Sequence, residues 1–143
     1  MNAVKLYIGI VYENDKKIGF SYQCQALNGE KLFSDNFVVK KQGLENLFAH
    51  IVKKILRQSH NNEPLYIGVY SDYQDIVTYV HRLIEDKHYD HVRQLKYQPR
   101  GQLFKMLRSY RVKFILSTYP KDEVFELMKQ QALISLEEFR QEK

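Results

Sequence analysis

Cysteine, proline and tryptophan are scarce in this chain, which has one cysteine, three prolines and no tryptophan among 143 residues. A single cysteine, Cys24, allows neither an intrachain disulfide nor a zinc site built from cysteines. We therefore expect a reducing, cytoplasmic compartment, where thiols stay free. Long apolar runs are lacking too, since none approaches the about 20 residues that a membrane span needs. The apolar start of the chain is interrupted by Lys5, so neither a membrane anchor nor a signal peptide is expected.

The remaining composition is that of an ordinary globular protein. Hydrophobic residues make up 44% of the chain and charged residues 27%, which excludes disordered, collagenous and low-complexity classes. The length suits one core, and neither a linker nor an internal repeat divides it. We expect a single domain over residues 1–143.

Acidic residues are missing from one long stretch, residues 91–120. Seven basic residues lie there: Arg93, Lys96, Arg100, Lys105, Arg108, Arg111 and Lys113. The stretch therefore carries +7 while the rest of the chain sums to −2, and such a local field attracts polyanions. Interleaved aromatics, among them Tyr97 and Phe104, suit nucleic acid through phosphate neutralisation and base stacking. The plainer interpretation is a solvated basic face with Phe104 in the core.

The first third of the chain has the alternation typical of strands. Residues 4–12, 18–27 and 31–39 are rich in β-branched and aromatic residues. Asn28-Gly29 between the second and third predicts a hairpin, and Ser34-Asp35-Asn36 resembles a turn inside the third. Short turns between consecutive strands predict an antiparallel meander.

Helical periodicity then takes over. Apolar residues recur at helical spacing over residues 43–58, and the run 65–70 is typical of a buried central strand. Four further elements are predicted: a helix opened by Asp72 and Asp75, a helix after Gly101, a strand over 111–117, and a helix near Pro120. Ser135 with Glu138 resembles a capping box that opens a last short helix.

This order, three antiparallel strands and then alternating helices and strands, predicts an α/β fold with a mixed five-stranded sheet and helices on both faces. It resembles the ribonuclease H-like fold over about residues 4–132. That family holds two divalent metals with an Asp on the first strand, a Glu in the first helix, an Asp after the fourth strand and an Asp in the last helix. Glu45 in Leu44-Glu45-Asn46-Leu47 matches the Glu position, and Asp72 in Ser71-Asp72-Tyr73-Gln74 is similar to the family's Thr-Asp-Ser-Gln pattern.

The resemblance is incomplete at the other two positions. The first-strand position falls at Gly9, which offers no ligand oxygen, although Mg²⁺ sites depend on carboxylates. Glu126 lies about where the last carboxylate belongs, but a different alignment puts Phe125 there. The resemblance therefore implies a ribonuclease H-like domain without nuclease activity and without a bound cofactor. Its basic segment, residues 93–113, lies where the family has its basic substrate handle.

Several alternatives stay open on the sequence alone. Asp72 also suits a helix N-cap, and Glu45 an ordinary first-turn acid. Holliday-junction-resolvase-like proteins are a second, weaker resemblance through Lys16-Lys17-Ile18-Gly19.

Three functions follow from these readings. The first is a catalytically degenerate domain that binds RNA, DNA or a hybrid. The second is a nuclease or resolvase that uses Mg²⁺ or Mn²⁺ at Glu45, Asp72 and Glu126. The third is a non-catalytic scaffold for a protein partner or a second copy of the chain.

Overall fold

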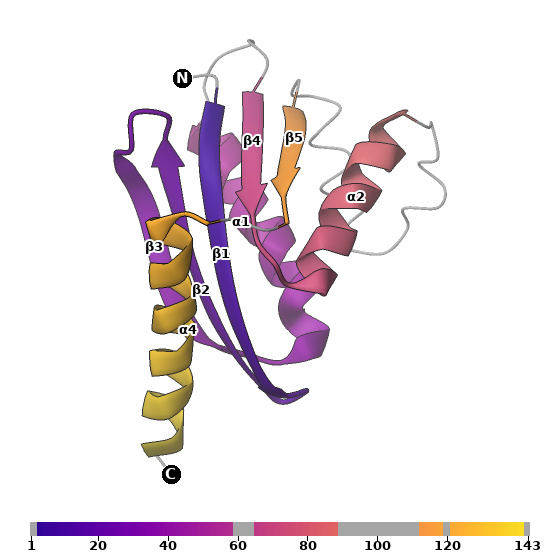
Figure 1. The fold of residues 1–143 in the computed structure, drawn as a ribbon. Coiled ribbons are helices and arrows are strands. Elements are labelled where there is room, and N and C mark those ends of the chain that lie inside the picture. The colour runs from indigo at the N-terminus through magenta and orange to yellow at the C-terminus, as the bar shows by residue number, and fades with distance from the viewer. Residues whose placement is uncertain (1–2, 59–64, 89–111, 119–120, 142–143) are drawn as a thin grey trace.

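The computed structural model describes residues 3–58, 65–88, 112–118 and 121–141. Five strands, one short 3-10 helix and three α-helices lie in this part of the chain (Figure 1). They are β1 (Ala3–Asn14), β2 (Lys17–Ala26), β3 (Lys31–Val39), η1 (Lys41–Gly43), α1 (Leu44–Gln58), β4 (Leu65–Tyr70), α2 (Gln74–His88), β5 (Val112–Ser117) and α4 (Glu123–Gln141).

The described strands form one mixed sheet in the order β3-β2-β1-β4-β5. β1 pairs antiparallel with β2 and β2 with β3, whereas β4 runs parallel to both β1 and β5. This confirms the predicted meander followed by parallel strands. The helix expected after Gly101 lies outside the described residues.

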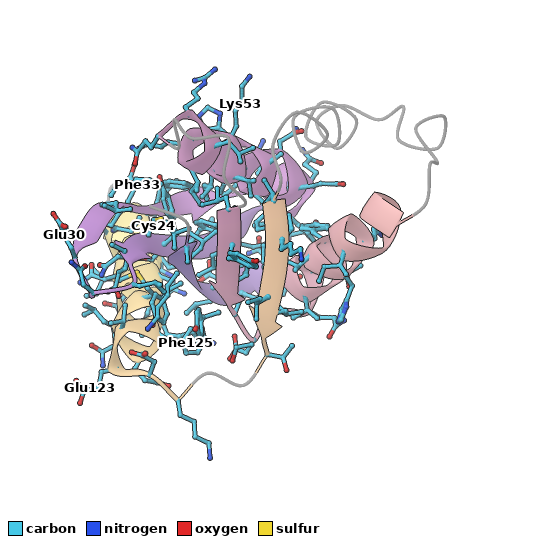
Figure 2. All side chains as sticks on the ribbon, turned by 90° about the horizontal axis from the view of Figure 1, so that it is seen from above. Cys24, Glu30, Phe33, Lys53, Glu123 and Phe125 are labelled. Carbon is cyan, nitrogen blue, oxygen red and sulfur yellow. The ribbon has the colours of Figure 1, made fainter. Side chains whose placement is uncertain are left out.

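Helices cover both faces of the sheet, as predicted. Alternate β1 residues such as Leu6 and Ile8 point into a large apolar core that α1 closes with Phe48 and Val52. The opposite alternation places Tyr7 in a smaller cluster with Phe125 and Met128 of α4. Figure 2, seen from above, shows α1 and α4 on opposite sides of the strands. The period of two along each strand thus decides which helix a side chain meets.

The β2–β3 hairpin forms where Asn28-Gly29 predicts it. Gly29 adopts a φ of +92°, which suits a residue without a Cβ, and its amide donates to the Ala26 carbonyl at 3.0 Å. Asn28 accepts a hydrogen bond from the Glu30 amide through Oδ1 at 3.0 Å. The turn therefore needs positive φ only at Gly29.

The predicted turn at Ser34-Asp35-Asn36 is wrong, since β3 runs through all three residues. Their backbones pair with β2 in the register Ser34–Gln23, Asp35–Tyr22 and Asn36–Ser21. β3 lies at the edge of the described sheet. Polar side chains suit such a strand because they oppose further strand pairing.

The predicted short last helix is also wrong, because α4 continues unbroken from Glu123 to Gln141. Ser135 is buried in its middle, where its Oγ accepts a hydrogen bond from Nδ2 of Asn36 at 2.7 Å. Its hydroxyl is thus held by β3 and caps no new helix. Ala132 and Leu136 on either side are buried as well.

Cys24 is fully buried in the α1 core, as its alternation predicts. Burial raises the pKa of its thiol to about 12, so the thiol stays protonated and unreactive at neutral pH. Among the helices described, none is long and apolar enough to cross a membrane.

Candidate functional site

The candidate site lies where β4 ends beside β1. Tyr7 and Tyr70 are the last partners in the parallel register, and Gly9 and Asp72 each lie two residues beyond them. The resemblance places the family's first-strand carboxylate at Gly9.

No room exists at position 9 for any side chain. A Cβ built on Gly9 would lie 2.5 Å from the backbone nitrogen of Lys129 and still closer to the carbonyl carbon of Met128. Gly19 on β2 is similar, because its Cβ would lie 2.9 Å from the carbonyl carbon of Ala132. The backbone of α4 therefore rests directly on two side-chain-free positions of the sheet. The space of the expected ligand is filled by helix.

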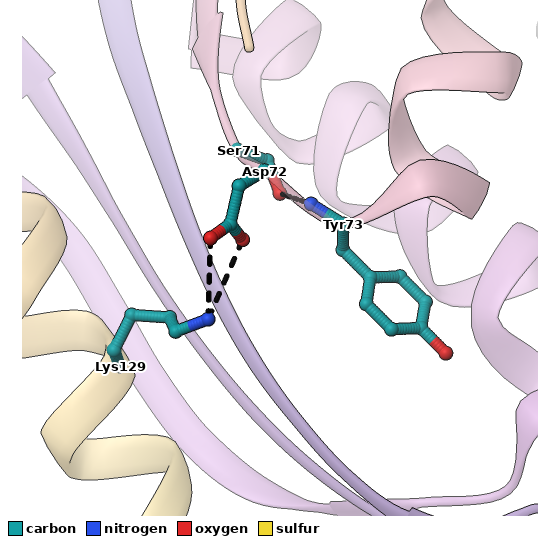
Figure 3. Close-up of polar contacts among 4 residues, drawn as sticks. All are labelled: Ser71, Asp72, Tyr73 and Lys129. Carbon is teal, nitrogen blue, oxygen red and sulfur yellow. Dashed lines mark hydrogen bonds and ion pairs between the residues drawn. The ribbon is translucent and has the colours of Figure 1, made fainter. Parts of the chain in front are cut away.

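Asp72 pairs with a cation of the protein itself. The Nζ of Lys129 donates to the two carboxylate oxygens of Asp72 at 3.3 and 3.5 Å (Figure 3). The side chains are 33% exposed for Lys129 and 41% for Asp72, so solvent screens the pair. In the turn before α2, the Oγ of Ser71 accepts a hydrogen bond from the Tyr73 amide at 3.3 Å. Asp72 therefore faces α4, and its possible capping of α2 finds no support here.

Glu45 lies in the first turn of α1 and is half-buried. Its charge acts on Tyr79 of α2, whose pKa is raised to about 12 by burial first and then by the charges of Asp75 and Glu45. Glu45, Asp72 and Glu126 do not come together as a metal site. Within the described ranges no group of three His, Cys, Asp or Glu side chains is placed to hold a metal ion.

Phe125, and not Glu126, faces the sheet from α4. Phe125 is 3% exposed and packs with Tyr7 and Met128, whereas Glu126 is exposed to solvent. Of the two residues that the alignments offer, Phe125 is the one that packs against the sheet.

Asp122 is the acid that the sequence reading missed. Its Oδ1 accepts from the Val124 amide at 2.9 Å, which caps α4, and its Oδ2 accepts from the Tyr7 hydroxyl at 2.8 Å. Burial and this hydrogen bond raise the pKa of Tyr7. An Asp directly before a helical run is a preferred N-cap. The cap could therefore have been predicted from the sequence, whereas the hydrogen bond from Tyr7 could not.

Of the seven basic residues, only Lys113 lies in the described part of the chain. It is exposed on β5, with its Nζ 5.9 Å from the centre of the Tyr66 ring on β4. Arg93, Lys96, Arg100, Lys105, Arg108 and Arg111 lie outside the described residues.

Known proteins resemble this chain in structure and not in sequence. No protein-family model and no curated protein matches it.

Three solved structures illustrate the likeness. The N-terminal ribonuclease H domain of a Mycobacterium tuberculosis protein matches with a TM-score of 0.60 and 11% identity, over 99% of both chains. A ribonuclease H1 from the archaeon Halobacterium salinarum matches with a TM-score of 0.54 and 11% identity, over 96% of this chain and 99% of that one. A ribonuclease H1 isolated from compost, solved with an RNA/DNA hybrid, matches with a TM-score of 0.59 and 10% identity, over 95% and 98%.

These matches run over nearly the whole chain and agree with the mixed sheet, its strand order and the helices on its two faces. Identities of this size speak for the fold alone. The chain has the ribonuclease H-like fold.

Proposed function

We propose that this chain is a catalytically degenerate ribonuclease H-like domain that binds nucleic acid through its basic segment, residues 93–113. The observation that carries the proposal is the close contact between the backbone of α4 and Gly9. A divalent metal needs carboxylate oxygens in a closely set geometry, and a carboxylate at position 9 would collide with the helix backbone.

Lys129 supports the same proposal. Its ammonium group lies against Asp72, one of the two acids that match the family pattern. A cation there already balances the charge that a metal would balance, and it repels a second cation. Phe125 in place of the last carboxylate adds to this.

Nucleic-acid binding is supported by charge and by analogy. The segment has a charge of +7 and contains no acidic residue, and phosphates are its natural counterions. The compost ribonuclease H1 of the same fold is known with an RNA/DNA hybrid bound.

The test is fluorescence anisotropy of a labelled RNA/DNA hybrid, titrated with protein at several salt concentrations. We expect binding that weakens steeply as salt rises. Changing Arg108→Ala and Arg111→Ala together should weaken binding and flatten the salt dependence by about two units of slope, because two phosphate contacts are lost. Changing Lys53→Ala and Arg57→Ala on α1 removes the same charge elsewhere and is the matched control.

Three results would overturn the proposal. Unchanged binding in the Arg108/Arg111 variant would remove the segment from the interface, and a defined oligomer without nucleic-acid affinity would favour the scaffold function. Hybrid cleavage with Mg²⁺ or Mn²⁺ that Asp72→Asn abolishes would show an active nuclease.

A further inference from the structure

Half of one sheet face carries no helix of the part of the chain that the structure describes. α4 packs over β1, β2 and β3, and no other described element lies on its side of β4 and β5. Figure 1 shows α4 displaced towards β3, and Figure 2 shows β4 and β5 with α1 on one side only. This open face comprises Lys5, Tyr66, Gly68, Tyr70, Lys113 and Ile115.

The register arranges these residues in rows across β1, β4 and β5. Tyr66 stands beside Lys113, the next row is Lys5, Gly68 and Ile115, and Tyr70 stands beside Tyr7 in the row after that. Neighbouring strands are about 4.8 Å apart. Lys5 and Ile115 are therefore about 10 Å apart across a row whose middle position has no side chain.

The open face is aromatic and apolar at its centre. Tyr66 is 38% and Ile115 is 61% exposed, whereas residues on the opposite face of the same strands, such as Ile67 and Val112, are buried. A Cβ on Gly68 would lie 3.3 Å from Cε1 of Tyr70, so Gly68 gives the Tyr70 ring space to lie along β4. Tyr70 stacks on Tyr7 with ring centres 4.7 Å apart. Tyr7 is itself buried and is held by Asp122, so the Tyr70 ring packs on a fixed support.

The two basic residues of the open face lie in its first two rows. Lys113 lies beside Tyr66 near the start of β4, and Lys5 lies beside Gly68, one row further on. The acids at the other end are already engaged, Asp72 by Lys129 and Asp122 by Tyr7 and the α4 backbone. The exposed aromatic ring is therefore flanked by the cations of this face.

We propose that the open face binds single-stranded nucleic acid, with a base stacked on Tyr66 and the adjoining phosphates held by Lys5 and Lys113. Unpaired bases stack on exposed aromatic rings of a sheet, and lysines beside the rings neutralise the backbone. The inference rests on the proposed nucleic-acid function. It adds a second surface, which includes Lys113 and distinguishes unpaired from paired strands.

The test compares a labelled ten-nucleotide oligo(dT) with the labelled RNA/DNA hybrid by anisotropy. Tyr66→Ala should weaken oligo(dT) binding about tenfold and hybrid binding much less, because bases in a duplex are already stacked. Tyr66→Phe should retain binding. Tyr12→Ala, which removes another exposed tyrosine far along β1, is the matched control. Lys5→Gln with Lys113→Gln should flatten the salt dependence for oligo(dT).

A measurement on the unaltered protein removes any dependence on variant folding. Ultraviolet cross-linking of an oligonucleotide that contains 5-bromouracil, mapped by mass spectrometry, should modify Tyr66. Cross-links confined to residues 93–111, or equal losses for both probes in Tyr66→Ala, would overturn this inference while leaving the proposed function standing. If the unaltered protein bound neither oligo(dT) nor the hybrid, both this inference and the proposed function would be overturned.

Discussion

The two faces of the sheet are packed by opposite means. Towards α1, the strands bury large apolar side chains such as Leu6, Ile8 and Ile67 against Phe48 and Val52. Towards α4, close contact depends on side chains that are missing, at Gly9 and Gly19. The first face fills space with side chains, and the second brings two backbones together. The comparison teaches that a helix can pack on a sheet in two ways. It can pack against large apolar side chains, or it can approach the strands closely where they have no side chains.

Adding one methyl group to the α4 face tests this difference most strongly. Gly9→Ala should lower the free energy of unfolding by about 3 kcal/mol, since backbone atoms of α4 block the new Cβ and overpacking has few ways to relax there. Gly19→Ala should behave alike, and Gly9→Asp worse, because it adds a buried charge. Urea titration measures the effect.

Gly43→Ala provides the control for these glycine variants. A Cβ there would meet only Cγ2 of Val39 at 3.5 Å, an ordinary contact, so stability should change by about 0.5 kcal/mol or less. If Gly9→Ala proved as harmless as Gly43→Ala, the close contact between the α4 backbone and Gly9 would be contradicted.

A smaller effect is expected on the α1 side at high pH. The folded protein holds the Tyr79 proton more tightly than the unfolded chain, because burial and the charges of Asp75 and Glu45 raise the pKa of Tyr79 from 10.0 to about 12. Stability from this group is complete below pH 10 and is lost as pH rises towards 12. The loss should be about 1 kcal/mol, since solvent screens the partly exposed ring.

Tyr79→Phe isolates that contribution. Between pH 9 and 12, the melting temperature should fall less steeply with pH for this variant than for the unaltered protein. Parallel curves would mean that Tyr79 titrates alike in both states.

The smallest effect belongs to the Asp72–Lys129 pair. Both side chains are well exposed, so Asp72→Asn or Lys129→Met should change the free energy of unfolding by less than about 1 kcal/mol. A double-mutant cycle measures the coupling, which added salt should reduce. A coupling of several kcal/mol would contradict a merely surface contact between the sheet end and α4.

Periodicity predicted what depends on side-chain alternation. The strands, the α1 helix and the order of elements followed from apolar residues two or about 3.6 positions apart. The turn at Ser34-Asp35-Asn36 and the break at Ser135 were wrong because tertiary contacts decided them, pairing with β2 in one case and the bond to Asn36 in the other.

The candidate site was only half accessible from the sequence. Gly9 could be recognised as a position without a ligand, but the helix backbone that fills its space could not be. Asp72 was found by its motif, whereas its partner Lys129 lies 57 residues away. The choice between Phe125 and Glu126 depended on the rotation of α4 about its axis, which local sequence leaves open by one residue.

The packing of α4 on β1 and β2 also sets the order in which the two faces of the sheet are covered during translation. Translation completes β1 and β2 first, yet their glycine-lined face is covered by the element made after all five strands. The hydrogen bond from Tyr7 to Asp122 closes a separation of 115 residues, and contacts so distant form late. On the ribosome, one face of the first hairpin can acquire its core early while the other stays exposed to water until α4 has emerged.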